Sequence, residues 1–218
     1  MPQQKADYAD DAEIDDSLDQ VPDDETLEET VANLEEHGFD VIAVDDAADA
    51  LDAVEAQIPA GVSVMNGHST TLEEIGFDEL LSEGDHEWES LPDEIWGIDD
   101  DAKRQAARRR SQTADYFLGG INAIAQTGEL VAADLSGSRV GAYPFAAGNV
   151  IIVSGVNKVV PTLDDAFDRL ESVAYPLENE RAQEAYGVES AVAKQLIYRR
   201  ETEEGRTTVV LVRERLGY

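Results

Sequence analysis

The fold is decided by the stretch FDVIAVDDAADALDAVEAQIPAGVSVM, residues 39–65. It opens with an apolar run at residues 39–44, which predicts a buried β-strand. Apolar residues then recur at helical spacing over residues 47–58, and a proline and a glycine separate them from a second apolar run at residues 62–65. Strand, helix and strand in this order predict an α/β fold in which helices cover both faces of a parallel sheet.

The segments on either side continue this alternation. Asp23 or Asp24 can cap a helix that has Leu27 and Leu34 on one face and ends at Gly38. Beyond residue 65, the pairs Thr70/Glu73 and Thr71/Glu74 both fit a capping box and predict a helix that starts near Ser69. We expect a loop or short helices at residues 84–97, helices at 102–112 and 163–173, and strands at 114–118, 129–134, 149–154, 158–160 and 208–212.

Glycines and turn residues predict three interruptions in the second half of the chain. Gly119 and Gly120 are expected to break the strand that precedes them. Residues 121–126 then predict a short helix or a tight turn. Residues 136–138 predict a turn, after which residues 139–142 would pair back as a hairpin.

The net charge of the chain indicates the salt concentration at which the protein is expected to work. The chain has 48 acidic and 16 basic residues, a formal net charge of −32, and acids occur in every segment. Such a charge destabilises a compact fold through self-repulsion, but at molar salt the screening length falls to roughly 3 Å. The basic residues include only four lysines: Lys5, Lys103, Lys158 and Lys194. We therefore expect a protein with an acidic surface from a halophilic microbe.

The same composition excludes several classes of protein. Nucleic acid is not an expected partner, because the one basic run, residues 103–110, reads as a helix face balanced by acids at residues 99–101. The absence of cysteine excludes disulfides and thiolate ligation of Fe–S clusters. An acidic N-terminus and the lack of a long apolar run predict a cytoplasmic protein that does not cross a membrane. Residues 1–22 are predicted to be a disordered acidic tail before a single domain at residues 23–218.

Three strings in the sequence resemble the LUD (lactate-utilisation) domain family. They are STTLEEIG at residues 69–76, NAIAQTG at residues 122–128 and GVNKVV at residues 155–160. The pair Arg139-Val140 and the closing string ERLG at residues 214–217 are similar to one branch of that family, and the likeness runs in order over about residues 24–218. A cysteine-rich segment follows the last helix in that branch, whereas residues 179–194 here contain no cysteine.

The resemblance implies a Rossmann-like parallel or mixed sheet flanked by helices, similar to the ribose-5-phosphate isomerase and coenzyme A transferase superfamily. It also implies a link to the use of lactate and other organic acids. Without the cysteines, redox centres would have to lie on a partner chain, an Fe–S or flavin protein.

The first candidate site is the loop between the strand at residues 62–65 and the following helix. Gly67 would let the backbone approach a ligand, and a helix N-terminus favours phosphate or carboxylate. The alternative is an ordinary strand-to-helix turn. The ligand-binding candidates here are Asn66, Gly67, His68, Ser69 and Thr70.

The second candidate site follows the strand at residues 114–118 and repeats this logic. Ligands of parallel sheets bind at the carboxyl ends of strands, so both loops are expected at one sheet edge. Its glycines could instead permit only a tight crossover. The candidates are Gly119, Gly120, Asn122, Gln126, Thr127 and Gly128.

Catalysis would need a base or a nucleophile. His68 could be a general acid or base, and Glu129 draws attention because coenzyme A transferases use a glutamate nucleophile. Chance placement in an acid-rich chain and a plain turn histidine are the alternatives. Asp134 and Arg139 are expected to form a cross-strand ion pair. Lys158 could meet an anionic ligand, although a solvated surface position is the default.

These observations leave three functions open. The first is a ligand-binding component of organic-acid utilisation that takes a small anionic metabolite or nucleotide-like cofactor. The second is an enzyme of the transferase, isomerase or hydrolase type, and the third is a non-catalytic subunit of an oxidation complex. No metal-ligand spacing, dinucleotide fingerprint or phosphate-binding loop occurs, no cofactor is identified, and a homodimer is compatible with the sequence.

Overall fold

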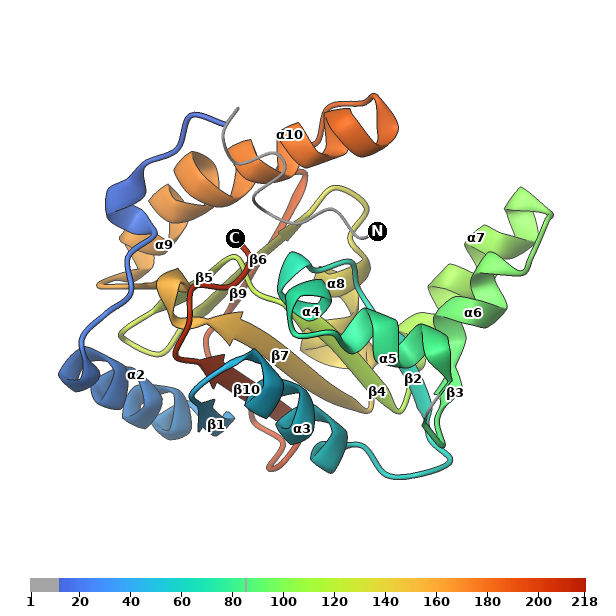
Figure 1. The fold of residues 1–218 in the computed structure, drawn as a ribbon, viewed down its shortest axis with the longest axis horizontal. Helices are drawn as coiled ribbons and strands as arrows, with labels where there is room; N and C mark the ends of the chain where they lie inside the picture. Colours follow the sequence, from blue (N-terminus) through green and yellow to red (C-terminus); the bar gives the residue numbers. More distant parts are fainter. Residues whose placement is uncertain (1–11, 85) are drawn as a thin grey trace.

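The computed structural model describes residues 12–84 and 86–218, which form two β-sheets and the helices packed around them (Figure 1). The larger sheet has six strands in the order β1-β10-β7-β4-β2-β3, all paired in parallel. The smaller has four in the order β8-β5-β6-β9, with β5 parallel to β8 and antiparallel to β6. The strands are β1 (Asp40–Val44), β2 (Ser63–Asn66), β3 (Glu89–Ser90), β4 (Tyr116–Gly120), β5 (Ala123–Ala125), β6 (Leu130–Asp134), β7 (Asn149–Gly155), β8 (Val159–Val160), β9 (Lys194–Tyr198) and β10 (Thr207–Val212).

The helices follow from caps and apolar periodicity. The Asp23 side chain accepts the Thr26 N–H at 2.8 Å and begins the first long helix, which buries Leu27, Thr30 and Leu34. The helices are α2 (Asp24–Glu36), α3 (Ala47–Gln57), α4 (Thr70–Glu74), α5 (Phe77–Glu83), α6 (Leu91–Trp96), α7 (Asp101–Arg110), α8 (Ser138–Gly141), α9 (Leu163–Arg169) and α10 (Tyr175–Tyr186). Shorter or wider turns are η1 (Asp16–Leu18), η2 (Ser111–Thr113), η3 (Ala142–Ala146), η4 (Val156–Lys158) and η5 (Leu170–Ala174).

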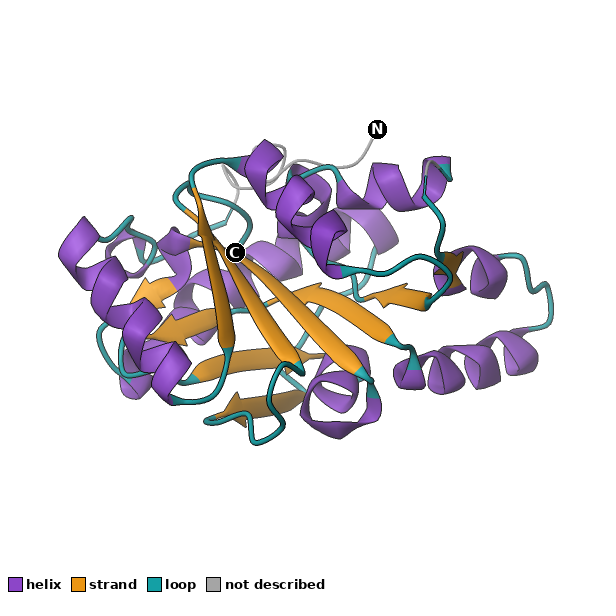
Figure 2. Ribbon diagram, turned by 90° about the horizontal axis from the view of Figure 1, so that it is seen from below, coloured by secondary structure: helices purple, strands orange, loops and turns teal. Residues whose placement is uncertain are grey.

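Helices cover both faces of the six-stranded sheet (Figure 2). The side chains of the central strands alternate between the faces: Val150 and Ile152 of β7 pack with α2, while Ile151 and Val153 pack with α3, α4 and α5. This confirms the α/β fold with a mainly parallel sheet. Within the described residues, no helix combines the length and apolar character that a membrane crossing requires.

Two neighbouring strands leave the larger sheet together and enter the smaller one together. β4 and β7 are parallel neighbours in the first sheet, and the chain continues from them into β5 and β8, which are parallel neighbours in the second. The crossings are short: Ile121 and Asn122 after β4, and η4 after β7. We call this crossing point the sheet junction. Residues 120–122 and 156–158 lie next to each other there.

Of the predicted interruptions after residue 118, only the turn near residues 136–138 forms, where the chain bends between β6 and α8. β4 runs through Gly119 and Gly120. A Cβ at Gly119 would lie 2.1 Å from the Tyr143 hydroxyl oxygen, so this glycine makes room for a packed side chain and does not end the strand. Residues 123–125 form a strand, not a helix, and residues 138–141 form helix α8, so the expected hairpin does not exist. β6 pairs instead with β5 on one side and on the other with β9, a strand for which we made no prediction.

Two further details differ from expectation. β1 is an edge strand with no fully buried residue, so the apolar run at residues 39–44 marks a half-covered strand and not a buried one. The helix predicted near Ser69 begins there, but neither predicted capping box forms. Ser69 itself is the N-cap, and its hydroxyl oxygen lies 3.4 Å from the Leu72 nitrogen.

Part of the predicted disordered tail is structured. Residues 1–11 lie outside the described residues, but from residue 12 the chain packs on η5, and Asp19 is only 1% exposed. The Asp19 carboxylate accepts hydrogen bonds from Arg169 (2.7 Å), Arg215 (2.6 Å) and Asn157 (2.8 Å). Arg169 is fully buried; burial lowers the pKa of its guanidinium, and Asp19 opposes this. A buried ion pair therefore fixes the N-terminal segment at the sheet junction.

We predict that Asp19→Asn lowers the free energy of unfolding by about 3–5 kcal/mol, because it leaves the buried Arg169 charge without its carboxylate. Chemical denaturation followed by circular dichroism measures the change.

The matched control is Asp16→Asn, which removes the same charge from an exposed position in η1. It should change the free energy of unfolding by less than about 0.5 kcal/mol. Equal effects of the two substitutions would contradict the structural role of the buried pair.

Candidate functional site

A cleft with a volume of about 610 Å³ lies at the carboxyl ends of β2 and β4, beside the sheet junction. Ligands of parallel sheets bind at this edge, so its position agrees with the fold. Its walls come from the loop after β2, the sheet junction, the end of β6, α6 and α10. Eight of the predicted site residues line this cleft. Those that line it are Asn66, Gly67, His68, Ser69, Thr70, Gly120, Asn122 and Lys158.

Lys158 lies at the deep end of the cleft with 1% of its surface exposed, so a solvated surface position is excluded. Its ammonium group donates to the Thr71 hydroxyl at 2.9 Å and to the Ile121 carbonyl at 3.1 Å. These contacts hold the charge at the sheet junction. A lysine is thus fixed where an anion could reach it.

Backbone carbonyls at the sheet junction accept hydrogen bonds from buried side chains. The Gly120 carbonyl accepts from the Tyr143 hydroxyl at 2.8 Å and from Arg139 at 3.3 Å. The Ile121 carbonyl accepts from Lys158, and the Asn122 carbonyl from Arg169. Cationic side chains therefore supply hydrogen bonds to three consecutive carbonyls, at the point where β4 ends.

Arg139 forms the wall between the two candidate loops. Its guanidinium donates to Asp134 at 2.8 Å and to the Ala133 carbonyl at 2.7 Å, and α8 places it there. The expected Arg139–Asp134 ion pair forms, but between a helix and a strand end instead of across a hairpin. A Cβ at Gly67 would lie 2.5 Å from the Arg139 side chain, so Gly67 makes room for Arg139.

The predicted anion site at the N-terminus of α4 is weaker than expected. α4 has only five residues, so few peptide dipoles add up there. Ser69 and Thr70 are nevertheless buried in the cleft wall, 6% and 5% exposed. A Cβ at Gly120 would lie 2.6 Å from the Ser69 hydroxyl oxygen, so the two candidate loops are in contact.

A group of ionisable side chains lies on the β2 side of the cleft. His68 Nδ1 is 3.2 Å from Glu73 Oε1, and the His68 side chain is 40% exposed. Asp78 accepts a hydrogen bond from the Asn66 amide at 2.7 Å. Burial, together with the nearby Glu73 charge, raises the pKa of Asp78 to about 6, against the opposing effects of His68 and Asn66. Asp78 can therefore exchange a proton near neutral pH.

The cleft is far less acidic than the chain as a whole. Four of the 16 basic residues line it, but only four of the 48 acidic ones. Two of the acids are paired, Asp134 with Arg139 and Glu178 with Arg181. The basic residues are Arg108, Arg139, Lys158 and Arg181, and the acidic ones are Asp78, Asp134, Glu178 and Glu189.

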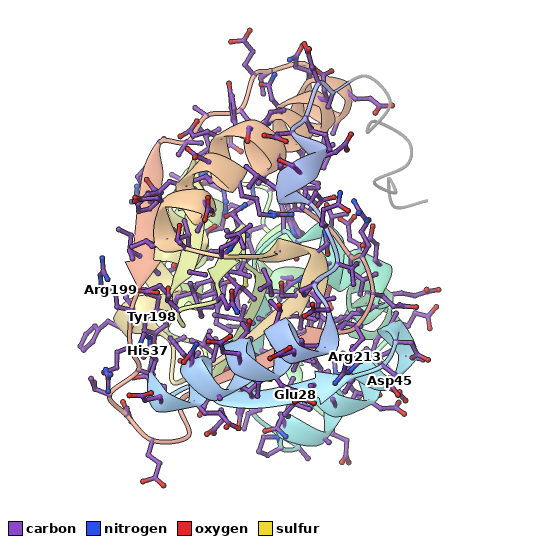
Figure 3. The ribbon with its side chains drawn as sticks, turned by 90° about the vertical axis from the view of Figure 1, so that its left-hand side faces the viewer. Glu28, His37, Asp45, Tyr198, Arg199 and Arg213 are labelled. Atoms are coloured by element: carbon purple, nitrogen blue, oxygen red, sulfur yellow. The ribbon has the colours of Figure 1, made fainter. Side chains whose placement is uncertain are left out.

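The remaining predicted residues lie elsewhere. The Tyr143 hydroxyl group occupies the space beside Gly119. Residues 126–129 form the closed end of the β5–β6 hairpin, whereas the cleft lies at the open end of that hairpin. Glu129 pairs with Arg199 at 3.1 Å and Gln126 with Glu29 at 2.8 Å. The Gly128 carbonyl is 3.0 Å from His37, and the Thr127 hydroxyl donates to Glu129 at 2.5 Å. Figure 3 shows His37 and Arg199 together on this face.

Sequence reasoning missed three kinds of cleft residue: Asp78, Arg181 and the aromatic Trp96. Asp78 follows Asn66 by twelve positions, and only the packing of α5 against β2 joins them. Arg181 and Trp96 belong to helices whose position over the sheet edge had no signal in the sequence. Among the described residues, no group of three or more His, Asp or Glu side chains is placed to hold a metal ion.

We predict that Asp78→Asn raises the free energy of unfolding by about 1–3 kcal/mol at pH 7.5. Because the folded-state pKa is raised to about 6, the protonated carboxyl favours the folded state below pH 4, and this contribution is lost as the pH rises through 6. The gain should therefore vanish below pH 4. Denaturant titrations at several pH values measure it.

Asp52→Asn removes the same charge from an exposed position on α3 and serves as the control. Because the position is exposed, it should change the free energy of unfolding by less than about 0.5 kcal/mol at each pH. A constant difference between Asp78→Asn and the wild type over this range would contradict the raised pKa.

Comparison with known proteins places the chain in a family. The profile of the LUD domain matches residues 27–212. No curated protein matches significantly. Among solved structures, the chain is similar to a DUF162 family protein from Deinococcus radiodurans, with 14% sequence identity, a TM-score of 0.44, and coverage of 86% of this chain and 96% of the other. Since the LUD profile spans the chain from α2 to the end of β10, this protein belongs to the LUD domain family.

Proposed function

We propose that this protein binds a small anionic ligand in the cleft and acts as a ligand-binding component of lactate or organic-acid utilisation. The single observation that carries the proposal is the buried ammonium group of Lys158 at the deep end of the cleft. A ligand carboxylate or phosphate at this position would be held by a strong charge-assisted hydrogen bond.

Neighbouring groups support an anion over a cation. Ser69 and Thr70 place hydroxyl groups, and Asn122 an amide, in the same wall. The relative enrichment of basic residues means that the cleft repels an anion less than the net charge of −32 would suggest. Membership of the LUD domain family supports an organic acid as the ligand.

The proposal predicts that L-lactate, pyruvate or inorganic phosphate raises the melting temperature of the wild type. For a chain of this size, each kcal/mol of binding free energy raises the midpoint by about 2–4 °C. Lys158→Met should weaken the binding about 10- to 100-fold, as expected for the loss of a hydrogen bond to a charged group. Calorimetry gives the dissociation constants.

Lys103→Met is the matched control, because Lys103 is exposed on α7 and does not line the cleft. It should bind the anions as the wild type does. Binding that is equally strong in folded Lys158→Met would contradict the proposed site, and the absence of binding by all three anions would contradict the function.

A second function, proton transfer on the bound acid, is supported by the His68–Glu73 pair and by Asp78 in the same cleft. Glu73 can accept the Nδ1 proton of His68, which orients the ring and leaves Nε2 as a base. A base there would remove a proton from the carbon next to the carbonyl of a keto acid and return it to the same carbon.

This second function predicts that the protein exchanges the methyl hydrogens of pyruvate with D₂O, measured by NMR. His68→Gln should slow the exchange at least about 100-fold, because it removes the base. The control His37→Gln alters a histidine at the end of α2, outside the cleft. Exchange at the uncatalysed rate in the wild type, or no change in His68→Gln, would exclude this function.

A further inference from the structure

Exposed apolar side chains gather at the mouth of the cleft. Among the described residues, seven large apolar side chains are exposed, and four of them line the cleft. Trp96 is 73% exposed and Tyr186 is 69% exposed. Such a concentration of exposed apolar surface at one site is typical of a binding surface. The four residues are Trp96, Leu135, Tyr186 and Val188.

The two aromatic residues come from separate elements. Trp96 is the last residue of α6 and Tyr186 the last residue of α10. In Figure 1, α10 runs along the top of the molecule and α6 lies at its right-hand side. The two rings therefore belong to two different walls of one cleft.

Arg181 fixes the position of Tyr186. Its guanidinium lies 5.6 Å from the centre of the Tyr186 ring and is held by two hydrogen bonds of 2.8 Å to Glu178. A cation over one face of an aromatic ring is attractive. Tyr186 is thus presented to the cleft in a defined orientation although it is largely exposed.

The size of the cleft exceeds what a small acid requires. At about 610 Å³ it lies within the range of sites that enclose drug-sized ligands, and a three-carbon acid would fill only a small part of it. Its lining also differs with exposure: Ser69, Thr70, Asn122 and Lys158 are buried polar residues, whereas the exposed lining residues include the four apolar ones named above together with Ser136 and Glu189.

We propose that the ligand is an anion joined to a planar aromatic ring, with the anionic group at Lys158 and the ring against Trp96 and Tyr186. This inference rests on the proposed function, because it adds a second binding region to the same site. Aromatic side chains stack on planar rings more favourably than the buried area alone accounts for. Nucleoside phosphates and aromatic carboxylic acids both have this chemistry.

The test compares two pairs of probes that differ by a ring. Adenosine 5′-monophosphate is paired with inorganic phosphate, and phenylpyruvate with pyruvate. The chain has two tryptophans, so Trp88→Phe leaves Trp96 as the sole fluorescent reporter. We expect the ring-bearing member of at least one pair to bind at least tenfold more tightly by calorimetry and to change the Trp96 emission. Which pair shows the effect identifies the ligand as a nucleotide or an aromatic acid.

Trp96→Ala should abolish this tenfold difference and leave the affinity for phosphate or pyruvate unchanged. The control Phe145→Ala removes an aromatic side chain that is 90% exposed and lies outside the cleft, and it should keep the difference. If the ring adds no affinity in either pair, or if Trp96→Ala retains the added affinity, the inference is overturned while anion binding at Lys158 stands. If none of the four probes binds, the inference is overturned, and if L-lactate does not bind either, the proposed function fails as well.

Discussion

The structure depends on how three consecutive carbonyls are satisfied where β4 leaves the six-stranded sheet. Gly120, Ile121 and Asn122 lie at the sheet junction, and their carbonyls accept hydrogen bonds from Arg139, Lys158 and Arg169 respectively. Unpaired buried carbonyls would cost free energy, and a short crossing leaves no room for an ordinary ladder. The junction is therefore built from long cationic side chains that reach it from elements later in the chain.

The cationic side chains of the sheet junction also link the fold to the cleft. Arg139 has Asp134, and Arg169 has Asp19, which comes from the N-terminal segment. Lys158, which donates to Thr71 and Ile121, lines the cleft. A charge that supports the backbone thus also faces the space where we propose that a ligand binds. In an otherwise acidic chain, the position of the proposed anion site would then follow from how the two sheets are joined.

The sequence predicted those elements that local patterns determine. The period of apolar residues and the caps gave α2, α3 and β10, and parallel topology placed the loops after β2 and β4 at one edge. Residues 119–126 were misassigned because glycine was interpreted as a break, whereas Tyr143 and Ser69, both distant in sequence, require its lack of a side chain. Residues 126–128 were grouped with Asn122 in one site because the β5–β6 hairpin has no sequence signal; the hairpin puts them at opposite ends.

The two regions of the cleft also differ in how firmly the fold holds them. Lys158 and Asn122 belong to the sheet junction, where a substitution affects the core, whereas Trp96 lies on α6, which buries only Ile95 and is followed by α7, which buries no residue. Residues at the periphery can change with little loss of stability. On the proposed function, the anionic group would then be recognised by the part of the molecule where substitutions reduce stability most. The rest of the ligand would be chosen by helices that can change independently.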